Sequence, residues 1–66
     1  MTGTIHYATV EGRTYKYWAD FVKRCTIAED EKGNQKAIRN GGYLKNDLSV
    51  RKAIAQSYGC KTFRKV

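Results

Sequence analysis

The chain has 66 residues, 41% of them hydrophobic, and a formal net charge of +7. A chain of this length forms one domain at most, so residues 1–66 are expected to make a single small domain. The sequence has no run of about 18 apolar residues, which excludes a membrane-spanning helix, and its N-terminus lacks the pattern of a secretory signal. We therefore expect a complete, cytoplasmic gene product that has no membrane partner.

The positive charge is distributed unevenly along the chain. Residues 1–35 contain five Lys or Arg and five Asp or Glu, whereas residues 36–66 contain eight Lys or Arg and Asp47 as their one acid. The whole net charge therefore lies in the second half. Such an asymmetry carries information about partners rather than about fold, and it favours an anionic partner.

The first half of the chain predicts strands. Residues 4–10 are rich in β-branched and aromatic side chains, which are typical of a strand. Residues 11–12 end in a glycine and predict a tight turn into a second strand over residues 13–18. Side chains alternate along a strand, so Tyr15 and Tyr17 are expected on the same face of the sheet.

Residues 19–28 fit either a helix or a strand. A helix would place Lys23 and Arg24 toward its N-terminus and three acidic residues at its C-terminus, and both placements oppose the helix dipole. Two adjacent β-branched residues near the end of the segment also favour a strand. We therefore predict a strand here, keep the helix as the alternative, and expect a hairpin loop over residues 29–34.

A second hairpin is expected after this loop. Residues 35–39 predict a short strand, and Asn40-Gly41 is the strongest turn signal in the chain. The turn would lead into a further short strand over residues 42–45.

The helix with the clearest end signals spans residues 48–58. Asn46 or Asp47 is expected to cap its N-terminus, and Gly59 is expected to end it in a left-handed conformation. The face expected to pack on the sheet contains Val50, Ala53, Ile54, Ser57 and Tyr58.

These elements together predict an α+β fold. We expect a small antiparallel β-sheet of hairpins with one C-terminal helix packed on it. Residues 60–66 are expected to add a short final strand at an edge of the sheet.

The sequence offers little for catalysis, which needs a nucleophile with a base, a carboxylate pair in a cleft, or a metal. The clustered acids at residues 29–31 are adjacent in an expected exposed loop. His6 has no predictable orienting partner, and Cys25 and Cys60 lack the spacing of metal ligands. We therefore expect no enzyme, no cofactor, no metal and no small-molecule substrate, with both thiols reduced; a small ribonuclease that uses His6 is the minor alternative.

The candidate binding residues are cations of the second half, together with one face of the predicted helix. Ser49, Lys52 and Gln56 share the solvent side of this helix, and such side chains contact phosphates and base edges. The basic and amide candidates are Arg39, Lys45, Arg51, Lys52, Gln56, Lys61, Arg64 and Lys65.

Tyrosines on the predicted sheet are the aromatic candidates. Sheet surfaces that bind nucleic acids combine aromatic rings, on which bases stack, with flanking cations. Tyr15 and Tyr17 are the residues we select, and whether they are exposed or fill the core stays open. Trp18 is expected to belong to the core.

The composition and these candidates lead to two hypotheses. The first is a small nucleic-acid-binding protein, regulatory or accessory in role, with DNA favoured over RNA. The alternative is a small protein-interaction module or phage-type inhibitor, which would dock a basic and aromatic surface on an acidic patch of a host protein. Phosphates and carboxylates attract the same cations, so the sequence leaves both open, together with the oligomeric state.

Overall fold

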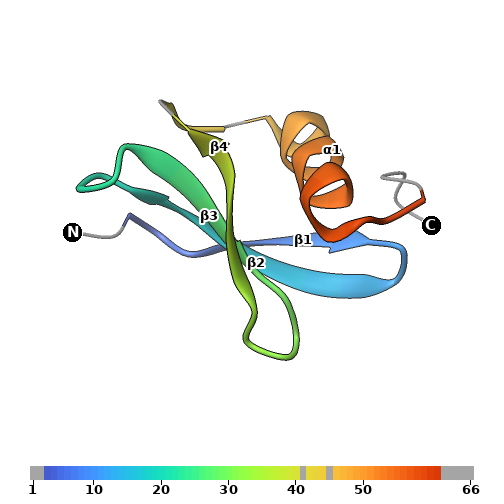
Figure 1. Ribbon diagram of the computed structural model, residues 1–66. Coiled ribbons are helices and arrows are strands. Elements are labelled where there is room, and N and C mark those ends of the chain that lie inside the picture. Colours follow the sequence, from blue (N-terminus) through green and yellow to red (C-terminus); the bar gives the residue numbers. More distant parts are fainter. Residues whose placement is uncertain (1–2, 41, 45, 62–66) are drawn as a thin grey trace.

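The computed structural model describes residues 3–40, 42–44 and 46–61. Its elements in chain order are β1 (His6–Val10), β2 (Arg13–Asp20), β3 (Cys25–Glu29), β4 (Gln35–Asn40) and α1 (Asp47–Tyr58) (Figure 1). The strands form one antiparallel sheet in the order β1-β2-β3-β4, so that each strand pairs with its neighbours in sequence. The predicted α+β fold, a sheet of hairpins with a helix packed on it, is confirmed.

The β1–β2 hairpin closes where the sequence predicts. Glu11 and Gly12 have φ angles of 53° and 73°, and a type I′ turn requires positive φ at both central residues. The register places Ala8 directly opposite Tyr15, and both side chains belong to the hydrophobic core. Alternate residues of both strands therefore face the helix.

The predicted strand over residues 19–28 is wrong in one respect, because a four-residue turn breaks it. Asp20 ends β2, and its Oδ1 accepts hydrogen bonds from the backbone N–H groups of Val22 (3.1 Å) and Lys23 (3.0 Å). Arg24 completes the turn with a φ of 54°. Asp20 is the one turn-favouring residue here, since the four residues that follow it include no glycine or proline. The helix alternative for this segment is wrong.

The β3–β4 loop forms where it is predicted, although Glu29 still belongs to β3. The Asp30 carboxylate accepts hydrogen bonds from the backbone N–H groups of Lys32 (2.9 Å) and Asn34 (2.8 Å). Gly33 has a φ of 88°, which few other residues adopt. The loop is thus organised around a single aspartate.

β4 contains a bulge that the sequence does not reveal. Thr26 pairs with Arg39 and Ile27 pairs with Ala37, so Ile38 is an extra residue in β4. A bulge sets two residues opposite one and redirects the side chains beside it. Ile38 packs against the core, and Arg39 lies opposite Thr26 on the helix side of the sheet. The bulge therefore brings Arg39 to the side on which α1 packs.

The predicted second hairpin is wrong, because residues 42–44 form no strand. Thr26, which is 1% exposed, holds this segment through its side chain. Its hydroxyl accepts a hydrogen bond from the Leu44 N–H (2.9 Å) and donates to the Gly42 carbonyl (3.4 Å). A buried hydroxyl therefore holds this segment in place of the backbone hydrogen bonds of a strand. Residues 41 and 45 lie outside the described part of the chain.

Helix α1 ends at the predicted residue and begins at Asp47, one residue before the predicted start. Asn46 is the N-cap, and its Oδ1 accepts hydrogen bonds from the N–H groups of Leu48 (2.9 Å) and Ser49 (3.3 Å). Gly59 ends the helix with a φ of 72° and donates its N–H to the Ala55 carbonyl. Both caps satisfy backbone groups that a helix leaves unpaired at its ends.

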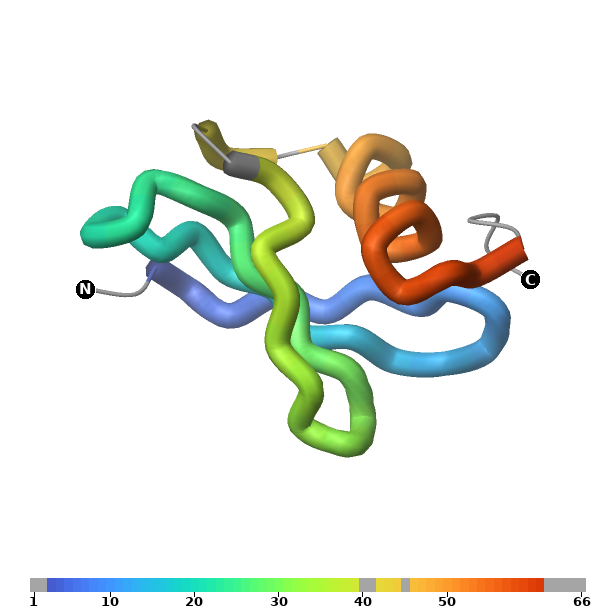
Figure 2. The backbone as a smooth tube through the Cα atoms, viewed as in Figure 1, coloured from blue at the N-terminus to red at the C-terminus, as the bar shows by residue number. Residues whose placement is uncertain are grey.

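The helix packs against β1 and β4, which are the two edges of the sheet. In the view of Figure 2, β4 runs steeply across the β1–β2 hairpin, so the sheet is strongly twisted. Val50, Ile54 and Ala55 are buried at this contact. Tyr58, on the predicted face, is half-buried, as are Ala53 and Ser57, and that prediction missed Ala55. The sheet residues of the core are Ala8, Val10, Tyr15 and Ala28.

The predicted final strand is not observed in the residues that are described after α1. Cys60 and Lys61 are not in a strand, and residues 62–66 lie outside the described part. Cys25 and Cys60 are both free thiols. Within the described ranges, no helix has the length and apolar character needed to cross a membrane.

Candidate nucleic-acid interface

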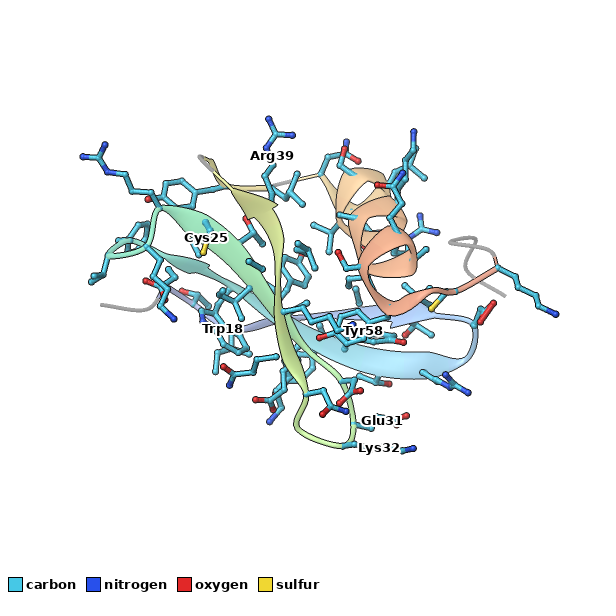
Figure 3. The ribbon with its side chains drawn as sticks, in the orientation of Figure 1. Trp18, Cys25, Glu31, Lys32, Arg39 and Tyr58 are labelled. Atoms are coloured by element: carbon cyan, nitrogen blue, oxygen red, sulfur yellow. The ribbon has the colours of Figure 1, made fainter. Side chains whose placement is uncertain are left out.

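A groove of about 290 Å³ between β4 and α1 brings together residues that were predicted from separate elements. Arg39 comes from β4, and Lys52 and Gln56 come from the exposed side of α1. Figure 3 shows Arg39 extending from the end of β4 into solvent beside α1. The remaining residues of this β4–α1 groove are Ile38, Leu44, Ser49 and Ala53.

The helix side of the groove follows from simple periodicity. Ser49, Lys52 and Gln56 are spaced three and four residues apart, so they lie on one face of α1. All three are exposed, as predicted, while the opposite face is buried through Val50 and Ile54. The packing of the helix therefore forces this polar row outward, next to β4.

Within the described part of the chain, no ion pair balances the two cations of the groove. Among the described residues, the ion pairs within 4 Å join Lys16 to Glu29 and Arg51 to Asp47, and neither involves Arg39 or Lys52. Two cations that line one groove repel each other, and an anion placed between them would relieve this repulsion. The β4–α1 groove is thus suited to phosphate or carboxylate groups.

Two predicted cations lie elsewhere. The Arg51 Nε is 3.0 Å from the Asp47 carboxylate in the first turns of α1, so this guanidinium helps to hold the helix start. Lys61 follows α1, and its backbone N–H donates to the Glu11 carboxylate at the β1–β2 turn (2.8 Å). Neither residue lines the groove. The other predicted cations, Lys45, Arg64 and Lys65, lie outside the described residues.

Tyr15 belongs to the core. It is 2% exposed, its ring lies 5.1 Å from that of Tyr58, and its hydroxyl is 3.7 Å from the Cys60 Sγ. Burial, followed by the contact with Cys60, raises the pKa of Tyr15 to about 12. This ring is therefore not available to stack on a base.

Tyr17 is half-buried and lines a second hollow, which we call the aromatic cavity. The cavity has a volume of about 550 Å³. The ring of Tyr17 stacks on His6 at 5.3 Å, and Phe21 meets Tyr43 edge to face at 5.3 Å. Burial, and secondly the Asp47 carboxylate, raise the pKa of Tyr17, so its hydroxyl stays neutral. Phe21 was not among the aromatic candidates, because the turn that carries it was not predicted. Tyr43 was not selected as a site residue, and the hairpin predicted around it does not form.

The side of the sheet away from α1 carries residues that alternate with those of the core, and one of them, Trp18, also contributes to the lining of the aromatic cavity. Figure 3 places Trp18 on this far side, and Trp18 pairs with the buried Ile27. Tyr7 pairs with Lys16 and is 63% exposed. Trp18 is half-buried, so the expectation that it fills the core is correct only in part.

No metal site is found within residues 3–40, 42–44 and 46–61, where no three His, Cys, Asp or Glu side chains group closely enough to hold an ion.

Comparison with known proteins found no family model, no curated protein and no solved structure that matches this chain.

Proposed function

We propose that this chain is a small nucleic-acid-binding protein without enzymatic activity, acting as a cytoplasmic regulatory or accessory factor, with DNA favoured over RNA. The observation that carries the proposal is the β4–α1 groove, where Arg39, Lys52 and Gln56 meet although 17 positions separate the first from the last. Cations contact phosphates, and an amide side chain beside them can read a base edge.

The mode of binding follows from the charge. Each lysine or arginine that neutralises a phosphate releases condensed counterions, so the affinity falls as salt rises. The net charge of +7 also attracts a polyanion before contact is made. Arg39 and Lys52 would bind phosphates of a nucleic-acid strand. Ser49 and Gln56 would donate hydrogen bonds to the same nucleic-acid strand.

The test is a set of titrations of duplex DNA, single-stranded DNA and RNA over a range of salt concentrations. The logarithm of the affinity should fall linearly with the logarithm of salt, with a slope near −0.9 for each phosphate neutralised on duplex DNA. Arg39→Ala and Lys52→Ala should each reduce the steepness of this slope by about one.

Lys32→Ala is the matched control. Lys32 is exposed on the β3–β4 loop, far from Arg39 in Figure 3, and its charge acts on the Asp30 carboxylate. The slope should stay unchanged in this variant. Failure of all three nucleic acids to bind below about 100 μM at low salt, where even non-specific binders reach this range, would reject the proposal. Losses concentrated in one or two anchor residues would instead indicate an acidic protein partner.

A further inference from the structure

The aromatic cavity lies directly beside the β4–α1 groove. Leu44 lines both hollows. The Arg39 Nε would lie 3.5 Å from a Cβ placed on Gly42, and Gly42 directly precedes Tyr43 in the wall of the aromatic cavity. The segment beside Arg39 therefore also contributes Tyr43 to the aromatic cavity, so the phosphate and the base of one nucleotide would be offered adjoining sites.

The cavity walls present rings that are already in position. Phe21 and Tyr43 support each other edge to face, yet they remain 49% and 39% exposed. Opposite strands contribute the stacked pair of His6 and Tyr17. Every nucleobase has a flat π-face that stacks on such rings, and a volume of about 550 Å³ lies in the range of small-ligand sites.

Polar groups in the lining favour a base over an apolar side chain of a protein. The lining includes Thr4, His6 and Tyr17, whose side chains carry hydrogen-bonding groups. An apolar side chain would cover these groups and leave them without partners, which is unfavourable. The edge of a base carries donors and acceptors that can pair with them.

We propose that the aromatic cavity binds one unpaired base of a single-stranded nucleic acid whose phosphates lie in the β4–α1 groove. This inference rests on the proposed function and narrows its substrate class. A base within a duplex is stacked on both faces and paired at its edge, so it can enter the cavity only from a single strand or after being flipped out.

The deciding experiment compares two DNA single strands of equal length, one of thymidines and one of abasic residues. Both carry the same phosphates, so the difference in affinity measures the bases alone. The wild-type chain should bind the thymidine strand about five- to 150-fold more tightly, which corresponds to the stacking of one base. A strand with one 2-aminopurine should also lose fluorescence on binding, because stacking quenches this base.

Variants connect the effect to the cavity. Phe21→Leu and Tyr43→Leu should remove most of the base-dependent difference while leaving the salt slope intact. Both side chains are exposed enough for folding to survive, which a thermal melt verifies. Val22→Ala is the matched control, because Val22 is in the same turn as Phe21, is 77% exposed and lies outside the lining. Tyr43→Phe should retain the effect, since the ring is kept.

The outcomes separate this inference from the proposed function. Equal binding of the thymidine and abasic strands, with a normal salt slope, would overturn the base site and leave nucleic-acid binding standing; the cavity would then be free for a protein side chain. A base-dependent difference that survives in both leucine variants would also overturn the base site. Failure of either strand, of duplex DNA and of RNA to bind would overturn both proposals.

Discussion

Single side chains at the helix–sheet contact determine how firmly α1 is attached. The Tyr58 hydroxyl donates toward the carbonyls of Ala28 (2.8 Å) and Asn34 (2.7 Å), which joins the end of the helix to β3 and its loop. Ile54 is fully buried at the centre of the same contact. A domain of this size has little stability to spare, so either residue is a sensitive point.

Replacing Ile54 should unfold a large part of the population. Ile54→Ala removes buried methyl groups and leaves a cavity, which costs about 2–5 kcal/mol. Leu48→Ala on the same helix serves as control, because Leu48 is 53% exposed and should change stability by less than about 0.5 kcal/mol. Urea unfolding of both variants measures the difference, and equal midpoints would reject the assigned helix face.

Two tyrosines should make the fold sensitive to alkaline pH. Burial raises the pKa of Tyr58 to about 12, with the Asp30 and Glu29 carboxylates adding to the effect, and burial raises that of Tyr15 similarly. An unfolded tyrosine has a pKa of about 10, so the unfolded state loses protons first. The contribution of these two tyrosines to the free energy of unfolding should be fully present below pH 10 and should fall as the pH rises toward 12. Thermal melts across this range test it, and Tyr58→Phe should show a shallower fall.

At the scale of elements, the ends of α1 are made by side chains from its flanks and from the sheet. Asn46 and Gly59 cap the helix, while the last turn of α1 contains no basic residue. Lys36 of β4 supplies that charge, because its Nζ donates to the Ser57 carbonyl at 3.0 Å and lies 4.9 Å from the centre of the Tyr58 ring. A cation at a helix C-terminus is stabilising.

The left-handed conformation of Gly59 at the end of α1 predicts the effect of replacing this glycine. At Gly59 an added Cβ meets no atom within 4 Å, so Gly59→Ala should cost only the conformational strain of positive φ, about 1–2 kcal/mol. Gly42→Ala is the matched control, because its Cβ would meet only Arg39 at an ordinary distance of 3.5 Å. Comparable melting temperatures for the two variants would show that Gly59 does not end the helix as described.

At the scale of the whole molecule, repulsion between unpaired cations should lower the free energy of unfolding of the free protein. An anionic partner would remove this repulsion on binding. Arg39 and Lys52 line one groove without an ion pair among the described residues, so they repel each other in the free protein. Arg39→Gln should therefore raise stability at low salt by about 0.5 kcal/mol, and added salt should erase the gain by screening. Lys32→Gln should produce no gain, because Lys32 is attracted to Asp30. A stability loss for Arg39→Gln at low salt would contradict this view of the groove.

Local signals explain the parts of the fold that were predicted correctly. The Glu11-Gly12 turn, the Asp30–Asn34 loop and both ends of α1 depend on residues within a few positions of each other. Turn and cap preferences of this kind can be recognised in any sequence that contains them. The uneven charge was likewise readable without a structure, although it does not identify the partner.

Only the tertiary structure determined where the candidate site lies. The segment at residues 42–44 is held by the buried hydroxyl of Thr26, and Arg39 reaches the helix side because of the bulge at Ile38. These contacts join residues that are distant in the sequence, so no local preference encodes them. The sequence by itself determined the sheet of hairpins with one packed helix and the positive second half, but not the turn at residues 21–24 or the path of residues 42–44. The packing of α1 across both edges of a twisted sheet then determined which of those cations share a groove. With Val50 and Ile54 buried against the sheet, the polar row that contains Lys52 lies beside Arg39 of β4.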